Sequence, residues 1–292
     1  MKFSVIIPTY NDWNRLEKCI EKLIEAKEEY DVSCEIIVVD NAAIHNPPEK
    51  FKNMNGIRLV HEETPGSYAA RNKGAVIATG YYLAFTDSDC IPGKFWLLNA
   101  DKVFQEKECD LIGGRIDLFR DEKTGNWAYI YESHTAFSQS KNVPKGHCVT
   151  ANLLIKRTVF EKLGGFNSEI KSGGDWEFSG RAVSSGYKLC YADDVMVFHP
   201  ARKTLKAIFK KQKRFAAWSY LNVQRDYGHS GLRILLSNAY HGFGSVFSRG
   251  NIPDTMYEKI VVFTISAGIY VYKTFLQICI ISGLTDPGKI RE

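Results

Sequence analysis

The sequence lacks the cysteine spacings that mark disulfide frameworks and zinc sites. Its seven cysteines are odd in number, spread along the chain and never spaced C-x-x-C. We therefore expect unpaired thiols and a reducing compartment. A long N-terminal apolar run is also missing, because Phe3–Ile7 leads directly into Pro8 without a small-residue cleavage site. These absences predict a cytoplasmic protein.

The sequence also lacks internal repeats, low-complexity tracts and a large overall charge. Its 292 residues are 45% hydrophobic and 24% charged, with 38 basic and 33 acidic side chains and a net charge of +5. This composition excludes a disordered or collagen-like chain and fits about two domains, or one large α/β domain with an appendage. The charge is uneven, because residues 202–233 carry +8 and the remainder −3. The sequence therefore predicts a slightly acidic body with one basic segment.

The first 90 residues alternate between strand and helix patterns. Phe3–Ile7 and Ile36–Val39 are short apolar runs typical of strands buried on both faces. Between them, residues 12–29 repeat apolar side chains at helical spacing, which predicts an amphipathic helix. Strand, helix and strand in this order form a right-handed unit of a parallel sheet. We expect further elements as a strand at 57–61, a helix at 67–79 and a strand at 82–86.

The alternation loosens after residue 90. Apolar runs at 111–112, 153–155 and 195–199 and a helix at about 176–185 indicate a mixed second half that shares the same sheet. The composition changes after Pro200, where the basic segment begins. We therefore expect a boundary near residue 200.

Two carboxylates, Asp87 and Asp89, follow the strand expected at 82–86. Open α/β sheets bind ligands at the carboxyl ends of their strands. Two oxygen donors one residue apart can reach one hard cation such as Mg²⁺ or Mn²⁺. Taken alone, the D-x-D pattern is weak evidence, because it is more often a solvated loop with two caps.

Five motifs in order strengthen the ligand interpretation. They are SVIIPTYN at 4–11, VVDN at 38–41, AARNKG at 69–74, FTDSD at 85–89, and LGGF at 163–166 followed by GDWE at 174–177 and Arg181. Their order and spacing resemble family 2 glycosyltransferases over residues 1 to about 200. The resemblance implies an α/β GT-A fold with a mainly parallel, Rossmann-like sheet flanked by helices. It divides the chain into a nucleotide-binding half (1–90), an acceptor-side half (91–200) and a helical C-terminal segment (201–292).

The resemblance assigns a donor site for a nucleotide-diphosphate sugar. It implies contacts to base or ribose from Thr9, Tyr10 and Asp40, and to the diphosphate from Arg71. A strand-end turn, a cap and a surface ion pair are the structural alternatives. Asn41 stands where the family usually has a second acid. An amide both donates and accepts hydrogen bonds, whereas a carboxylate only accepts, so the identity of the nucleotide base stays open. The full expected set is Pro8, Thr9, Tyr10, Asp40, Arg71, Asp87 and Ser88.

A metal site is implied at the same edge. The ligands are Asp87, Asp89 and His199, which ends an apolar strand where many family members place a histidine. Imidazole and carboxylates suit Mn²⁺ and are workable for Mg²⁺. A structural histidine at a strand end is the alternative.

Asp175 matches the carboxylate that serves as general base in this family. A sugar hydroxyl is a weak nucleophile, so a carboxylate must accept its proton as the new bond forms. Gly174 replaces an acid common at the preceding position, which makes Glu177 the second choice. The structural alternative is that Asp175 caps the helix expected from Trp176.

The resemblance implies an inverting, metal-assisted transferase that moves a sugar to a glycan or lipid-linked acceptor. A non-catalytic nucleotide-sugar-binding or scaffold protein is the alternative from another class. A nicotinamide-dependent enzyme is disfavoured, because no G-x-G-x-x-G follows the first strand. Selectivity residues fall in the loops of the second half, where the candidate walls of the acceptor site are Trp127, Tyr129, Tyr131 and His147.

The C-terminal segment combines a basic amphipathic helix at 202–225 with an apolar stretch at 260–282. The cations fit a solvated face or an anionic membrane surface better than nucleic acid, because no nucleic-acid-binding module accompanies them. Trp218 and Leu221 among the cations favour lipid. The stretch at 260–282 contains Lys273, which makes a full membrane span marginal and favours a buried or interfacial helix. We therefore expect peripheral attachment to the inner face of the cell membrane.

Overall fold

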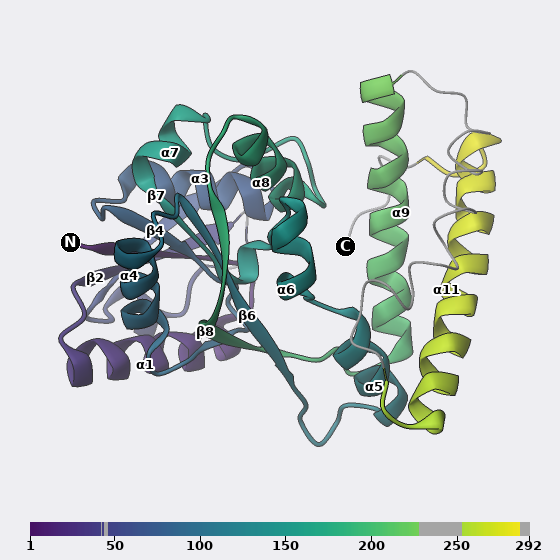
Figure 1. Cartoon of the computed structure of the whole chain (residues 1–292), viewed down its shortest axis with the longest axis horizontal. Helices are drawn as coiled ribbons and strands as arrows, with labels where there is room; N and C mark the ends of the chain where they lie inside the picture. The colour runs from purple at the N-terminus through teal and green to yellow at the C-terminus, as the bar shows by residue number, and fades with distance from the viewer. Residues whose placement is uncertain (42, 44–45, 228–252, 287–292) are drawn as a thin grey trace. The chain divides into compact units, whose positions relative to one another are not determined.

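A computed structural model describes residues 1–41, 43, 46–227 and 253–286 (Figure 1). The chain divides into two compact units. The first unit contains Met1–Asp117 and Gln139–His199, and the second contains Leu118–Ser138 and Pro200–Glu292. The chain leaves the first unit after Asp117, returns to it at Gln139, and leaves it again after His199.

The parallel half of the sheet follows the pattern read from the sequence. Strand β1 (Phe3–Thr9) pairs in parallel with β2 (Cys34–Asn41) and with β4 (Tyr82–Phe85), and β2 pairs with β3 (Ile57–Glu62). Every residue of β1 is buried, as expected for a strand covered on both faces. The connecting helices are α1 (Trp13–Tyr30), α2 (Glu49–Lys52) and α3 (Ser67–Ile77).

Helix α3 lies directly against the sheet because Gly74 has no side chain. A Cβ atom at position 74 would lie 2.5 Å from Cγ2 of Ile6 in β1. No other residue fits this approach without moving the helix. The close packing sets the distance between the sheet and the first two turns of α3, which carry Tyr68 and Arg71.

The second half of the first unit adds antiparallel strands, so the expected mixed sheet is confirmed. The full order is β3-β2-β1-β4-β7-β6-β8-β5. Strand β7 (Leu153–Lys156) runs antiparallel to β4 and to β6 (Leu111–Phe119), and β8 (Leu189–Pro200) runs antiparallel to β5 (Ile91–Pro92). The helices of this half are α4 (Trp96–Glu106), α6 (Gln139–Asn142), α7 (Arg157–Lys162) and α8 (Gly174–Ser184), with 3₁₀ turns at Val143–Lys145 and Thr150–Asn152.

An aromatic cluster fixes α8 to the sheet. Phe178 of α8 packs on Phe160 and Phe166 at ring-centroid distances of 5.3 and 4.8 Å. Phe85 at the end of β4 contacts the same two rings at 5.5 and 5.2 Å. The rings are fully or almost fully buried, and aromatic pairs of this kind add about 0.5–1.5 kcal/mol beyond their buried area. The start of α8 is therefore held firmly next to the end of β4.

The second unit is built from α5 (Asn126–Thr135), α9 (Leu205–Tyr227) and α11 (Met256–Ile281). Its core joins Ala128, Ile130 and Tyr131 of α5 to Ile208 of α9 and to the inner face of α11. Glu132 is buried and accepts hydrogen bonds from the backbone N–H and the guanidinium of Arg202, both at 2.6 Å. Arg233 and the side chains of Trp218 and Leu221, which the sequence assigned to the basic segment, lie outside the part of the chain that the structure describes.

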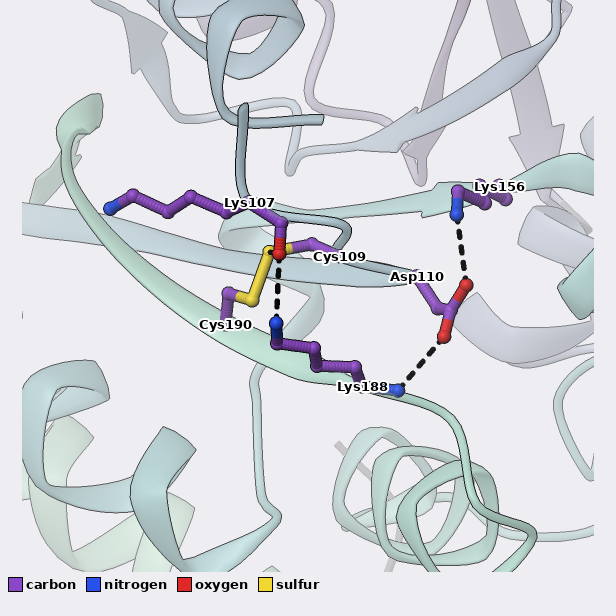
Figure 2. Close-up of a disulfide and its surroundings, with 6 residues drawn as sticks. All are labelled: Lys107, Cys109, Asp110, Lys156, Lys188 and Cys190. Atoms are coloured by element: carbon purple, nitrogen blue, oxygen red, sulfur yellow. Dashed lines mark hydrogen bonds and ion pairs between the residues drawn. A yellow bond between two sulfur atoms is a disulfide. The ribbon is translucent and has the colours of Figure 1, made fainter. Parts of the chain in front are cut away.

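The expectation of unpaired cysteines is wrong at one pair. Cys109 and Cys190 form a disulfide with a Cα–Cα separation of 6.0 Å, although 81 residues separate them (Figure 2). Asp110 brings the two segments together, because its carboxylate accepts from the backbone N–H of Lys188 at 2.9 Å and from Nζ of Lys156 at 3.0 Å. The two cysteines meet because their segments pair in the sheet, and the spacing of cysteines in the sequence does not reveal this pairing. The five other cysteines are unpaired.

Candidate active site

Polar residues collect where the parallel strands end. Thr9 is the last residue of β1 and pairs in register with Asp40 of β2. Both are buried, and His61 at the end of β3 contacts Oδ2 of Asp40 through Nδ1 at 3.2 Å. Among the described residues, Oγ1 of Thr9 and Oδ1 of Asp40 have no hydrogen-bond partner. Buried polar atoms without partners are costly, so this pair is prepared for a ligand.

Asn41 has a different role from its neighbour Asp40. Its amide nitrogen donates to the carbonyls of Thr64 at 2.7 Å and Glu62 at 3.4 Å, and its oxygen accepts from Gly66 N–H at 2.8 Å. The side chain therefore holds the turn that leads into α3. Its hydrogen-bonding groups are used within the fold, and the identity of the nucleotide base stays open.

The other residues expected near the nucleotide differ in exposure. Pro8 is buried within β1 and pairs in register with Val39, whereas Tyr10 is 52% exposed directly after the strand. Ser88 is half-buried between the two aspartates. Only Tyr10 of these three presents a large surface to an incoming molecule.

Asp87, Asp89 and His199 come together as a cluster. With Cys90, their potential ligand atoms all lie within 4.8 Å of one another. His199 reaches the cluster because β8 pairs with β5 in the register Ile91–Phe198. Its Nε2 lies 3.7 Å from Oδ1 of Asp89, and Nη1 of Arg15 lies 3.1 Å from Oδ2.

The donor set of this cluster fits a hard divalent cation. Two carboxylates and an imidazole are ligands that Mg²⁺ and Mn²⁺ accept. Burial raises the pKa of Asp89, an effect that His199 and Arg15 oppose and the charge of Asp87 reinforces. Burial also raises the pKa of the Cys90 thiol well above its ordinary value, so this group is a neutral neighbour of the site. A cation between the two carboxylates would relieve their repulsion.

Arg71 lies one helical turn from Tyr68 on α3 and is almost completely buried. Its Nη2 donates to Oδ1 of Asp87, and its guanidinium lies 5.7 Å from the centroid of the Tyr68 ring. Nε of Arg71 has no partner among the described residues. A buried guanidinium with an unused donor is well suited to a phosphate oxygen.

Asp175 is held at the start of α8. Its Oδ1 accepts from the Tyr68 hydroxyl at 3.1 Å and from the Trp176 backbone N–H at 3.0 Å. Helix α8 begins at Gly174, two residues earlier than expected, with Gly173 in the left-handed region at φ 83° as its N-cap. Burial raises the pKa of Asp175, while the backbone N–H of Trp176, the charge of Arg71 and the Tyr68 hydroxyl partly oppose this shift.

Tyr68 explains the glycine that replaces an acid before Asp175. A Cβ atom at Gly174 would lie 2.7 Å from Cε2 of the Tyr68 ring. The ring therefore occupies the space that a side chain at 174 would need. Its hydroxyl then supplies a hydrogen bond to the neighbouring carboxylate.

Glu177, the second choice for the base, is paired within its own helix. Nε and Nη2 of Arg181 contact its two oxygens at 2.7 and 3.1 Å. Arg181 also donates to the carbonyls of Leu163 and Gly165. These contacts give the arginine of this motif a positioning role, because it ties α8 to the loop before it.

The four residues expected to line the acceptor site lie in different surroundings. His147 stacks on Trp176, next to Asp175, at a centroid distance of 4.5 Å and an interplanar angle of 8°. In the second unit, Tyr131 is a core residue, which corrects its assignment as a wall. Trp127 donates to the Tyr257 hydroxyl at 3.0 Å, and Tyr129 lies under the Arg120 guanidinium at 5.2 Å.

Tyr68, Arg15 and His61 were not among the predicted site residues. Tyr68 directly precedes the motif at 69–74, but its partner Asp175 is 107 residues away. Arg15 lies three residues after Asp12, with which it also forms an ion pair. The i,i+3 spacing of Asp12 and Arg15 was the one feature of the sequence that pointed to any of these three residues. The contacts of His61 and Tyr68 depend on the folded sheet.

Known proteins resemble this chain in both sequence and fold. Residues 4–164 match the model for glycosyl transferase family 2. The chain is 34% identical to glycosyltransferase AglE of Haloferax volcanii over 220 residues, which cover 72% of this chain and 70% of AglE. It is 21% identical over 243 residues to a dolichyl N-acetyl-α-D-glucosaminyl phosphate 3-β-D-2,3-diacetamido-2,3-dideoxy-β-D-glucuronosyltransferase of Methanococcus voltae, covering 77% of this chain and 74% of that one.

Two solved structures share the fold. The mannosyltransferase PcManGT from Pyrobaculum calidifontis, in complex with GDP-Man and Mn²⁺, has a TM-score of 0.60 at 21% identity and covers 100% of this chain and 88% of its own. TarS 1–349 of S. aureus has a TM-score of 0.53 at 18% identity, with 97% and 92% covered. The mixed sheet and flanking helices match these GT-A glycosyltransferase structures. The chain belongs to glycosyl transferase family 2 and is a glycosyltransferase with the GT-A fold.

Proposed function

We propose that the chain is an inverting transferase that moves a sugar from a nucleotide diphosphate to an acceptor hydroxyl, with Asp175 as the general base. One observation carries this proposal. Tyr68 and Arg71, one turn apart on α3, contact Asp175 and Asp87 respectively. A proton-accepting carboxylate of α8 and a phosphate-binding cluster after β4 are thereby both tied to one short segment of α3, as a single displacement between them requires.

The donor would lie along the carboxyl ends of the parallel strands. Asp40 and Thr9 offer buried, unpartnered oxygens to base or ribose, with Pro8 and Tyr10 beside them. Arg71, Ser88 and Asp87 would face the diphosphate. The complex of PcManGT with GDP-Man and a complex of TarS with UDP-GlcNAc support a nucleotide-sugar donor of one of these kinds.

Asp87, Asp89 and His199 would hold the divalent cation. Bound there, Mg²⁺ or Mn²⁺ would neutralise charge on the departing diphosphate. The protein's own cations assist, since Arg71 is fixed beside Asp87 and Arg15 beside Asp89. The Mn²⁺ in the PcManGT complex supports this assignment.

The transfer balances as one displacement. The acceptor oxygen bonds to the anomeric carbon, the bond from that carbon to the diphosphate oxygen breaks, and its electron pair leaves with the diphosphate. The acceptor proton passes to the Asp175 carboxylate. Its raised pKa makes this carboxylate a stronger base than an exposed aspartate, and the Tyr68 hydrogen bond keeps it oriented.

The acceptor is proposed to be a glycan or a lipid-linked sugar. The names of two relatives support this class. One is the dolichyl N-acetyl-α-D-glucosaminyl phosphate glucuronosyltransferase of Methanococcus voltae, and the other is a poly(ribitol-phosphate) β-glucosyltransferase of Bacillus spizizenii. We propose that the reaction takes place on the cytoplasmic side, because five of the seven cysteines are unpaired, as is usual in a reducing compartment.

The test uses Asp175→Asn, which keeps the shape of the side chain and removes its charge. We expect release of nucleoside diphosphate from a panel of UDP and GDP sugars with Mn²⁺ to fall by roughly 100-fold or more. Donor affinity by calorimetry should stay within about twofold, because the base contacts the acceptor side.

Glu177→Gln is the matched control, with the same chemical change two residues along the same helix. Its carboxylate is held by Arg181, so turnover should remain close to that of the unmodified protein. Normal turnover by Asp175→Asn, or a loss confined to Glu177→Gln, would contradict the assignment of the base.

A further inference from the structure

Helix α11 has two apolar faces. The inner face carries Val261, Val262, Ile265 and Ile269, which are buried against α5 and α9. Farther along, Leu276 and Ile280 pack on Ala216 and Ala217 of α9. The inner face is thus covered along most of the helix, and α9 lies alongside α11 within this unit (Figure 1).

The opposite face is apolar and exposed. We define the outer stripe as Met256, Ile260, Val271, Phe275, Ile278 and Ile281, whose exposed fractions range from 39% to 71%. At about 100° per residue these positions occupy roughly 120° of the helix circumference, opposite the buried face. Between Ile260 and Ile281 the only charged residue is Lys273, which is half-buried. The outer stripe therefore runs along one side of α11 from Met256 to Ile281 and contains no charged residue.

The charge of the whole chain is concentrated in the same unit. The first unit contains 22 basic and 25 acidic residues, and the second contains 16 basic and 8 acidic residues. Lys206 and Lys210 of α9 are exposed. An uncharged apolar stripe within a unit of net charge +8 has the two properties that an anionic lipid surface attracts.

We propose that the second unit binds an anionic phospholipid bilayer, with α11 in the plane of the interface and its outer stripe among the acyl chains. Apolar side chains of the outer stripe leave water, and the cations of the unit attract the lipid phosphates. The sequence predicted a basic helix at 202–225 and a buried or interfacial helix at 260–282, and α11, which corresponds to the second of these, supplies the exposed apolar surface.

A membrane-spanning α11 is disfavoured by its neighbour. The helix is long and apolar enough to cross a bilayer, by length and composition alone. However, α9 packs along it and carries Lys206, Lys210 and Lys213, which a span would draw to the depth of the hydrocarbon. Burying such charges is costly, whereas the in-plane position leaves them in water or at the headgroups.

A second copy of the chain is a poorer occupant of the outer stripe. A symmetric contact would bring two units of net charge +8 together. Anionic lipid instead supplies the opposite charge. The two occupants predict different masses in solution and different responses to lipid.

The experiment is flotation of the full chain with vesicles of phosphatidylcholine alone or with 30% phosphatidylglycerol. We expect binding to the anionic vesicles that weakens as salt is raised. Val271→Glu and Ile278→Glu should each lower the partition coefficient by about tenfold. Val76→Glu is the matched control, because Val76 is an 82% exposed helical valine of the first unit, and it should bind like the unmodified chain.

Three results would overturn the proposal that the second unit binds lipid, and a fourth would overturn the in-plane position of α11. One is absence of flotation with anionic vesicles, and another is equal binding by the outer-stripe variants and the control. The third is a dimeric mass by light scattering that falls to the monomer in the outer-stripe variants without any lipid binding. Release of the chain from cell membranes by alkaline carbonate supports the in-plane position, and resistance to it contradicts that position. Unchanged nucleotide-sugar hydrolysis by the variants shows that the first unit stays folded.

Discussion

The hydroxyl of Tyr68 donates a hydrogen bond to the carboxylate of Asp175 across 3.1 Å. The same ring fills the space beside Gly174 and lies beneath the Arg71 guanidinium. Burial and the negative charge of Asp175 raise the pKa of the Tyr68 hydroxyl, so it stays protonated and donates throughout the working range of pH. Tyr68 is therefore a positioning residue for the proposed base.

Tyr68→Phe should move the acid limb of the pH–rate profile to higher pH. The lost hydrogen bond stabilised the charged form of Asp175, so its pKa, already raised by burial, rises further. The rate should drop in mildly acidic buffer and recover at higher pH, where the carboxylate is again ionised. Tyr81→Phe is the control, because Tyr81 is exposed and lies outside the site. A profile of unchanged shape would argue against this role of Tyr68.

Asp89→Ala should abolish the part of donor binding that depends on Mn²⁺. The substitution leaves Asp87 and His199 without their shared neighbour, and EDTA should reduce donor affinity in the unmodified protein to a similar level. Asp12→Ala is the control, because Asp12 also forms an ion pair with Arg15. If the loss of donor binding in Asp89→Ala came only from disturbing Arg15, Asp12→Ala should show a similar loss. Donor affinity that is equal with and without metal in the unmodified protein would exclude the proposed metal site.

Asp40→Asn should raise the donor KM by about tenfold or more with little change in kcat. The change removes the charge of a buried oxygen that has no protein partner among the described residues, and charged hydrogen bonds contribute about 1.5–3 kcal/mol. Asp194→Asn provides the same substitution at an exposed site in β8. If both variants keep the original KM, Asp40 does not contact the donor.

The disulfide can be tested by counting thiols. Labelling of the unfolded, unreduced chain should find five thiols, and peptide mapping should link Cys109 to Cys190. Replacing both residues with serine should lower the free energy of unfolding by about 2–4 kcal/mol, whereas Cys279→Ser should change it little. Finding seven thiols in protein purified without reductant would show that the bridge does not form in the cell that produced it.

The sequence predicted the parallel half of the sheet well because local patterns determine it. Apolar runs such as Phe3–Ile7 and the helical repeat of residues 12–29 each report on their own element. The strands of the second half were found as short fragments, since β6 extends from Leu111 to Phe119 with several half-buried positions. Helix α4 was not predicted, although its buried residues Trp96, Leu97, Ala100 and Phe104 recur at helical spacing.

The candidate site was predictable where a motif lies at the end of a strand, as at Asp87 and Asp40. It was not predictable where a contact joins distant segments. Tyr68 and Asp175, Asp89 and His199, and Cys109 and Cys190 meet through sheet pairing and helix packing. The place of the 118–138 segment in the second unit was not predictable for the same reason, because its apolar partners follow about 70 residues or more later in the chain.

The second unit is built from two separate segments of the chain, and this limits how the enzyme can be shortened. A truncation at residue 200 would remove α9 and α11 but leave α5, whose Ala128, Ile130 and Tyr131 are buried only among those helices. The shortened chain would expose the apolar face of α5, which favours aggregation. It would also leave the carboxylate of Glu132 without its ion-pair partner Arg202. A soluble catalytic fragment therefore needs two cuts, with residues 118–138 replaced by a short polar turn.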